Sequence, residues 1–298
     1  MKNQYLCDIG DYGKYALMRA FAMAGVKVGM NWFLTEDDGS NDGKFVDYLE
    51  KGDLRWLCPD LFDELAKIAK KKNRTIQDIE KSGILAGACY YSEQIPIGGT
   101  PDERLQKRAQ WFEKSLEVLA DAELIFADPD NGLLVSDNAK AKDSEKYILP
   151  AEVERMYRGG YNVVYYCHKG RRQYKAWVEY LSTMFERIDD AKPAVLTYHK
   201  GTQRSYVFLI HKKDFQKYRK IIDTFHSRWY RLFSEEYTEI GDVTREVTEA
   251  PFVVKCSDGA EVTIEKRADG KIQIKNSNNP TTYLILDADQ FCRRLWMY

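Results

Sequence analysis

The stretch Leu124-Ile125-Phe126-Ala127-Asp128-Pro129-Asp130-Asn131-Gly132 decides the fold class of this chain. Four apolar residues in a row, followed by Asp, Pro, Asn and Gly, are typical of a strand that is buried on both faces and ends in a loop. Pro129 restricts one φ angle and Gly132 frees another, which favours a loop of defined shape. Ligands collect at the carboxyl ends of parallel strands, so the polar loop residues are candidate catalytic residues: Asp128, Asp130 and Asn131. The alternative is an ordinary Asp/Asn turn with local hydrogen bonds.

Helical and strand patterns alternate on both sides of this strand. The predicted helices cover residues 12–24, 44–51, 59–72, 75–82, 101–120, a segment from Pro150, 171–187 and 212–231. The predicted strands cover residues 26–34, 124–128, 161–167, 194–199 and 204–210, and the Gly-rich stretch 83–100 is predicted to be irregular. This order predicts an α/β fold with three layers, a mainly parallel sheet with helices on both faces, and an antiparallel edge hairpin that turns at residues 200–203.

From about Gly241 the sequence pattern changes. Short runs of alternating apolar and polar residues, separated by turn residues, cover 252–256, 261–266, 271–275 and 282–286. We therefore predict two domains. Residues 1–236 form an α/β catalytic domain, and residues 237–298 form a small C-terminal β-rich domain closed by a helix at 288–296. The hypothesis for this second domain is substrate engagement or dimerisation, and the sequence leaves the oligomeric state open.

The formal net charge of −1 conceals a strongly basic segment. Residues 155–231 hold seventeen Lys or Arg, six Asp or Glu and sixteen aromatic residues, so the segment carries about +11 and the rest of the chain about −12. Cations that meet phosphates, interleaved with rings on which bases stack, favour nucleic acid as the partner, with DNA as the expected form. The alternative is that the cations cover the solvent faces of ordinary helices while the aromatic residues fill the core.

No window of the chain approaches the length of apolar sequence that a membrane span needs, and the first residues do not form a leader-like pattern. A cytoplasmic protein without a membrane partner is therefore expected. The six cysteines are scattered without a Cys-x-x-Cys pair, which indicates neither a zinc site nor a disulfide framework.

Two further polar clusters lie near the amino terminus. The acidic loop 35–43 follows the first predicted strand, and its residues Asp37 and Asp38 are candidate catalytic residues that could activate water or hold a hard cation. A solvated Gly/Asp loop is the alternative. Asp11 and Lys14 lie at the entrance to the first helix, and both are candidate substrate-binding residues. The alternative for Asp11 is that it is the N-cap of this helix.

Two histidines follow apolar strands beside basic residues. A neighbouring cation disfavours a charged imidazole, so a neutral hydrogen-bond donor to substrate is the role expected of His168 and His199, and His199 is the candidate catalytic one. The alternative is a strand-end histidine bonded to the backbone. The other substrate-binding candidates in this region are Lys169, Arg171, Arg172, Tyr198, Lys200 and Arg204.

The order of these features resembles the uracil-DNA glycosylase superfamily in layout: an acidic loop after the first strand, Asn131 after the second, and a histidine loop after the last. The resemblance implies that Asp37 or Asp38 activates water, that Asn131 reads the base edge, and that His199 stabilises the leaving base.

The strand that ends in Asp128-Pro129-Asp130-Asn131 also resembles the Asp-Pro-Pro-Tyr loop of the Rossmann-like adenine-N6 methyltransferases. This second resemblance covers about residues 26–210 and includes a terminal hairpin. The Gly-rich loop with which such enzymes bind S-adenosylmethionine is absent, and Asn31-Trp32-Phe33-Leu34-Thr35-Glu36 stands in its place.

Base excision needs a pocket for a flipped base, a carboxylate and a hydrogen-bond donor, but no cofactor. The first expectation is therefore a DNA-acting hydrolase of the glycosylase type, without cofactor or bound metal. A nuclease that holds a divalent metal through the acidic residues is the second hypothesis, and a nucleic-acid methyltransferase is the third. A non-enzymatic nucleic-acid-binding module is the alternative outside the enzymes. Phage defence or bacterial housekeeping is the hypothesis for the biological setting.

Overall fold

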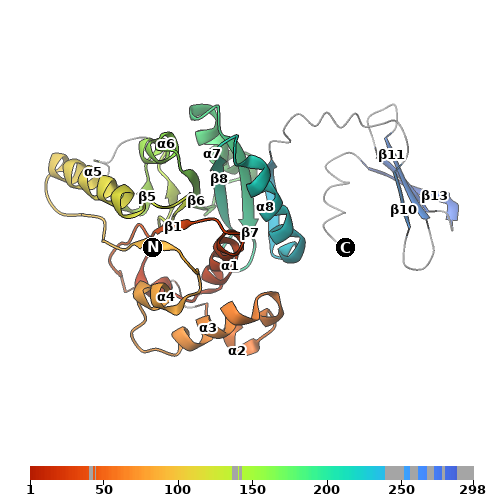
Figure 1. Ribbon diagram of the computed structural model, residues 1–298. Helices are drawn as coiled ribbons and strands as arrows, with labels where there is room; N and C mark the ends of the chain where they lie inside the picture. The colour runs from red at the N-terminus through yellow and green to blue at the C-terminus, as the bar shows by residue number, and fades with distance from the viewer. Residues whose placement is uncertain are drawn as a thin grey trace. The chain divides into compact units, whose positions relative to one another are not determined.

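The computed structural model describes residues 1–39, 43, 45–135, 140 and 143–238, together with four strands between residues 252 and 286. The chain divides into two units, Met1–Glu239 and Ile240–Tyr298. The first unit is an α/β domain and the second contains a small separate sheet (Figure 1). The predicted fold class is therefore confirmed.

Seven strands form the main sheet: β1 (Val28–Asn31), β2 (Cys89–Tyr91), β3 (Leu124–Ala127), β6 (Asn162–His168), β7 (Lys192–Tyr198), β8 (Arg204–Ile210) and β9 (Phe233–Thr238). Their order is β2-β1-β3-β6-β8-β7-β9. The first four run parallel, whereas β8 is antiparallel to both β6 and β7, and β9 is antiparallel to β7. The predicted hairpin of β7 and β8 is thus present, and its second strand lies between β6 and β7.

Helices cover both faces of this sheet (Figure 1). They are α1 (Ile9–Met23), α2 (Tyr48–Lys51), α3 (Pro59–Ala69), α4 (Ile76–Ser82), α5 (Pro101–Val118), α6 (Pro150–Arg158), α7 (Tyr174–Arg187) and α8 (Phe215–Trp229). One apolar core joins α1, α3, α4 and α8 to one face of the sheet, and a second core joins α5, α6 and α7 to the other. Residues of β3 alternate between the two cores, since Leu124 and Phe126 belong to the first and Ile125 and Ala127 to the second.

The first helix begins earlier than the sequence indicated. Asp8 is its N-cap, because the Asp8 side chain accepts a hydrogen bond of 2.9 Å from the Asp11 backbone N–H. The alternative role of Asp11 as the cap is therefore excluded. Because glycine lowers helix propensity, Gly10 and Gly13 made the first turn of this helix difficult to predict from the sequence. Both glycines allow side chains of β7 and β8 to pack directly against the helix backbone. A Cβ on Gly10 would lie 1.0 Å from Arg204 Nη1, and one on Gly13 would lie 2.9 Å from the Tyr198 ring.

Three parts of the main unit differ from the sequence prediction. The stretch 83–100, predicted to be irregular, contains the edge strand β2, and a further edge strand, β9, follows the last helix. Residues 132–133 and 147–148 pair as a two-stranded sheet, β4 (Gly132–Leu133) with β5 (Tyr147–Ile148). The helix predicted from residue 44 is only the single turn α2. Short edge strands have too few residues to show an alternating hydrophobic pattern. Their formation depends on the strands with which they pair.

The second unit contains a four-stranded antiparallel sheet of β10 (Phe252–Lys255), β11 (Glu261–Lys266), β12 (Ile272–Asn276) and β13 (Asn279–Leu286), paired in sequence order. The four predicted strands of this region are confirmed. The helix predicted at 288–296 lies outside the described residues.

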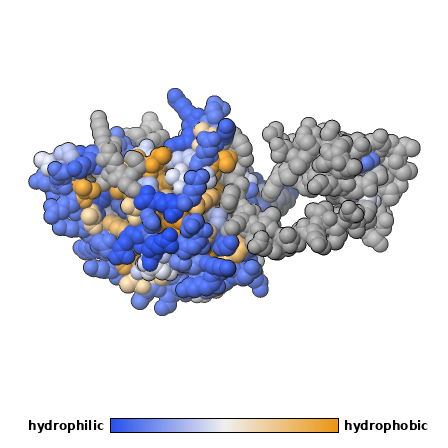
Figure 2. Space-filling view, turned by 90° about the horizontal axis from the view of Figure 1, so that it is seen from above, coloured by the Kyte–Doolittle hydropathy of each residue, from blue (hydrophilic) through white to orange (hydrophobic). Residues whose placement is uncertain are grey.

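Hydrophilic residues cover most of the described surface in the view from above, and apolar residues show in small areas between them (Figure 2). Among the helices that the structure describes, none combines the length and the apolar character needed to cross a membrane.

Candidate functional site

A pocket of about 240 Å³ lies at the carboxyl end of β3 and β6. The start of β8 reaches the same edge, because β8 runs antiparallel to β6 and Arg204 pairs with His168. The lining residues come from the N-terminal segment, α1, the loops after β1 and β3, β6 and the β7–β8 turn: Met1, Tyr5, Asp8, Asp11, Lys14, Gly43, Phe45, Asp128, Pro129, Asp130, Asn131, Tyr166, His168, Thr202 and Arg204. The crevice expected at the strand ends is therefore present as a polar pocket.

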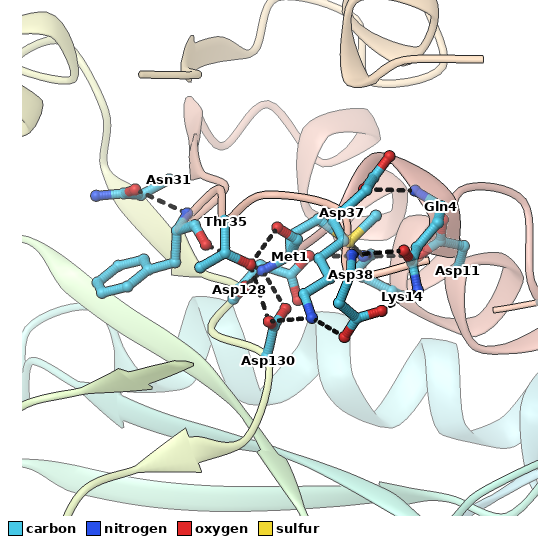
Figure 3. A network of polar contacts seen from close by, with 12 residues as sticks. Met1, Gln4, Asp11, Lys14, Asn31, Thr35, Asp37, Asp38, Asp128 and Asp130 are labelled. Atoms are coloured by element: carbon cyan, nitrogen blue, oxygen red, sulfur yellow. Dashed lines mark hydrogen bonds and ion pairs between the residues drawn. The ribbon is translucent and has the colours of Figure 1, made fainter. Parts of the chain in front are cut away.

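The loop after β3 is fixed by contacts with the N-terminal segment and the loop after β1 (Figure 3). The Met1 amino nitrogen lies 2.7 Å from Asp130 Oδ1 and donates to the carbonyl oxygen of Asp128 at 2.9 Å. The Thr35 hydroxyl donates to Asp130 Oδ2 at 2.9 Å. Both carboxylate oxygens of Asp130 are thus engaged within the protein, so Asp130 holds the loop in place.

Asn131 is the loop residue whose side chain is left for a ligand. Its backbone N–H donates to the Lys146 carbonyl at 2.9 Å, and its carbonyl accepts from the His168 N–H at 3.3 Å. The side chain lines the pocket, is half-buried and makes no hydrogen bond with the described part of the chain. A rigid backbone therefore presents an amide with both a donor and an acceptor.

A buried charge network forms the floor of the pocket. Lys14 Nζ lies 2.6 Å from Asp11 Oδ1 and 2.7 Å from Asp128 Oδ2, and all three side chains are at most 6% exposed. Burial would lower the pKa of Lys14, but the two carboxylates together raise it, so Lys14 stays charged. Burial raises the pKa of Asp11 to about 6, against the opposing effect of Lys14. Asp11 therefore takes up a proton more readily than an exposed Asp does.

Arg204 supplies a second buried cation. Its guanidinium fits over Gly10, its Nη2 donates to the Thr202 hydroxyl at 2.8 Å, and its Nη1 lies 3.5 Å from Asp8 Oδ1. Burial opposes the charged form, but Asp8 raises the pKa of Arg204. The pocket thus combines four Asp carboxylates with two fixed side-chain cations, Lys14 and Arg204.

The two acidic candidates of the loop after β1 reach this region only indirectly. Asp37 and Asp38 are exposed and contact the N-terminal segment: the Gln4 backbone N–H donates to Asp37 at 3.1 Å, and Lys2 Nζ donates to Asp38 at 2.5 Å. Lys2 Nζ also lies 3.8 Å from Asp130 Oδ2, which links the two loops. Neither Asp37 nor Asp38 lines the pocket.

The structure brings some of the predicted residues together and leaves others apart. Those that share the pocket are Asp11, Lys14, Asp128, Asp130, Asn131, His168 and Arg204. His199 is exposed and its Nε2 lies 2.7 Å from the Ser234 hydroxyl, Tyr198 is fully buried beside Gly13, and Lys200 is exposed in the hairpin turn. His199 is therefore not next to Asn131 in this pocket, as a shared excision site would need.

Sequence reasoning missed several lining residues, among them Asp8, Tyr5 and Phe45. Asp8 lay within the motif around Asp11 and could have been included with it. The sequence around Phe45 has no motif that indicates a binding site. In the structure, its ring is 59% exposed beside the pocket, and exposed apolar side chains of this kind often mark binding sites.

Within the described ranges, no group of three or more His, Cys, Asp or Glu is arranged to hold a metal ion. No family model matches this chain, and neither does any curated protein.

Proposed function

We propose that the α/β domain is a nucleic-acid methyltransferase that acts on the exocyclic amine of a base in this pocket. One observation carries the proposal. The Asp128–Asn131 loop, on which the methyltransferase resemblance rests, lines the pocket, and the sheet contains the β7–β8 hairpin that belongs to the same resemblance. Base excision stays the prediction of the other resemblance, but its acidic, amide and histidine residues do not share one pocket.

The pocket offers what recognition of an unstacked base requires. The Asn131 amide can donate and accept at once, which is how an asparagine pairs with the edge of adenine. Phe45 is exposed at the pocket and provides a face on which a base can stack. An enzyme that acts on a base must take it out of the helix, and a small pocket lined by an amide and a ring suits this step.

Asp128 is suited to bind the amine. Lys14 occupies its Oδ2, whereas Oδ1 makes no hydrogen bond with the described residues. A carboxylate oxygen that accepts an N–H bond raises the electron density on the nitrogen and can receive the proton that the amine loses. Lys14 keeps Asp128 oriented, since its ammonium is itself fixed by Asp11.

The methyl donor of such an enzyme, S-adenosylmethionine, supplies an electrophilic methyl group on a positively charged sulfur. The lining fits the charged end of this molecule, because the Asp8 carboxylate suits an ammonium group and the Tyr5 ring suits a sulfonium. The usual Gly-rich loop is missing after β1. Phe33 nevertheless has a φ of 44° there, a conformation that glycine adopts most easily.

The test is incubation of the full chain with S-adenosylmethionine and single- and double-stranded DNA and RNA, followed by digestion to nucleosides and mass spectrometry. We expect a base that carries one added methyl group. Asn131→Ala should lower this activity by at least roughly ten-fold without a change in melting temperature, because its backbone contacts remain. Asn73→Ala makes the same change at an exposed position and should have no effect.

Other products would contradict methyl transfer and identify the alternatives. Free base released without the methyl donor would indicate excision, and strand breaks that EDTA prevents would indicate a nuclease. Binding without any product would indicate a binding module.

A further inference from the structure

A second cavity of about 490 Å³ adjoins the pocket and shares His168 and Thr202 with it. Its other lining residues are Lys169, Gly170, Arg171, Arg172 and Gln203. The two cavities differ sharply in charge, since four Asp carboxylates line the first and none lines the second. A ligand that spans both would meet acidic groups at one end and three cations at the other.

The described residues do not neutralise these cations. Within the part of the chain that the structure describes, Lys169, Arg171 and Arg172 form no ion pair with a carboxylate. Three uncompensated cations on one short loop repel one another, a cost that an anionic ligand removes.

Contacts with the rest of the protein shape this loop. Gly170 has a φ of 58°, which turns the chain back directly after β6. Arg172 donates from Nη1 to the His168 carbonyl at 3.2 Å, and its guanidinium lies 4.2 Å from the centre of the Tyr180 ring. Lys169 Nζ donates to Gln203 Oε1 at 3.3 Å. Two of the three cations therefore have defined positions beside the pocket.

The start of α7 adds to the positive potential. The helix follows the loop directly, its N-cap Gln173 makes no capping hydrogen bond through its side chain, and its first turn holds no acidic residue. The positive end of the helix dipole is thus left uncompensated beside the same cations.

We propose that the Lys169–Arg172 loop binds a phosphate of the nucleotide whose base enters the pocket. This inference rests on the proposed function and specifies its substrate class: a nucleotide within a strand, recognised by base and phosphate together. A free base or nucleoside would leave the cationic cavity empty and bind poorly.

The experiment measures binding of a fluorescently labelled single-stranded oligonucleotide to the full chain by anisotropy, at several salt concentrations. Lys169→Ala/Arg171→Ala is the test variant, and Arg172 is kept because its stacking supports the loop. We expect affinity to fall by roughly ten-fold and the slope of log K against log salt to become shallower by about 0.7 for each phosphate that the variant no longer binds. Lys70→Ala/Lys72→Ala removes the same charge from exposed positions near the end of α3 and should leave the slope unchanged.

The outcomes separate this inference from the proposed function. A slope equal to that of the wild type in the folded test variant overturns the phosphate site, even if methyl transfer is found. Absence of oligonucleotide binding by the wild type at low salt overturns it as well. A shallower slope in a protein that makes no methylated base keeps the phosphate site and rejects the methyltransferase. In the assay of methyl transfer, the test variant should raise KM and leave kcat unchanged.

Discussion

Asp11 is a carboxylate with both oxygens bound inside the protein. Oδ1 contacts Lys14 at 2.6 Å, and Oδ2 accepts from the Cys7 backbone N–H at 2.9 Å. One ammonium serves both Asp11 and Asp128, so full ionisation leaves a net negative charge in a desolvated place. The residue that the sequence suggested as a helix cap is instead the group through which pH acts on the site.

The pKa of Asp11, raised from 3.8 to about 6 mainly by burial, makes stability depend on pH. Between these two values the folded protein binds more protons than the unfolded chain, so the wild type should lose stability as pH rises through that window. The loss is at most about 3 kcal/mol, since one pKa unit corresponds to about 1.4 kcal/mol. Asp11→Asn should remove this dependence, which denaturant unfolding between pH 4 and 7 measures.

The control for this effect is Asp53→Asn, the same change at an exposed position. Parallel pH profiles for Asp11→Asn and the wild type would show that Asp11 ionises normally in the folded protein.

At the scale of elements, a buried ion pair connects α5 and α6 to the site. Arg108 Nε lies 2.7 Å from Glu152 Oε1, and the same guanidinium donates to the carbonyls of Ser144 and Tyr147 at 2.8 and 2.7 Å. These carbonyls flank Lys146, whose own carbonyl accepts from the Asn131 N–H. Arg108 therefore supports, through two chain segments, the loop that lines the pocket.

Arg108→Ala should cost about 3–5 kcal/mol in the free energy of unfolding, because it leaves Glu152 buried without its partner. Arg155→Ala is a matched control on the same helix pair, since Arg155 binds Glu113 at 3.0 Å with both side chains about half exposed. It should cost less than about 1 kcal/mol. Denaturant unfolding measures both losses. If the two variants lose the same unfolding free energy, burial does not determine the contribution of these ion pairs to stability.

The elements also show which features a single sequence reveals. Strand β3 and the β7–β8 hairpin have continuous apolar runs and clear turns, so the sequence predicted them. It also predicted that Asp128 and Asn131 follow a strand toward a crevice. The sequence did not reveal that β8 enters the sheet between β6 and β7, nor that His199 contacts Ser234 on β9. Both depend on pairing between distant segments, for which a local pattern carries no signal.

On the scale of the whole molecule, every residue that lines the two cavities belongs to Met1–Glu239. This unit closes its own core as far as β9, where Phe233 is fully buried and packs on Tyr198 and Trp229. The site should therefore be independent of the second unit, whose hypothetical role is substrate engagement or dimerisation.

A chain that ends at residue 238 should consequently fold on its own, with a melting temperature within a few degrees of the full chain and an unchanged kcat. A chain that ends at residue 232 is the informative comparison, because it lacks Phe233 and exposes β7; loss of a buried Phe costs about 3–5 kcal/mol, so it should melt far lower. Calorimetry measures both. If the chain that ends at residue 238 also loses its cooperative melting, the first unit needs the second. If its KM for nucleic acid and its mass in solution equal those of the full chain, the second unit serves neither substrate engagement nor dimerisation.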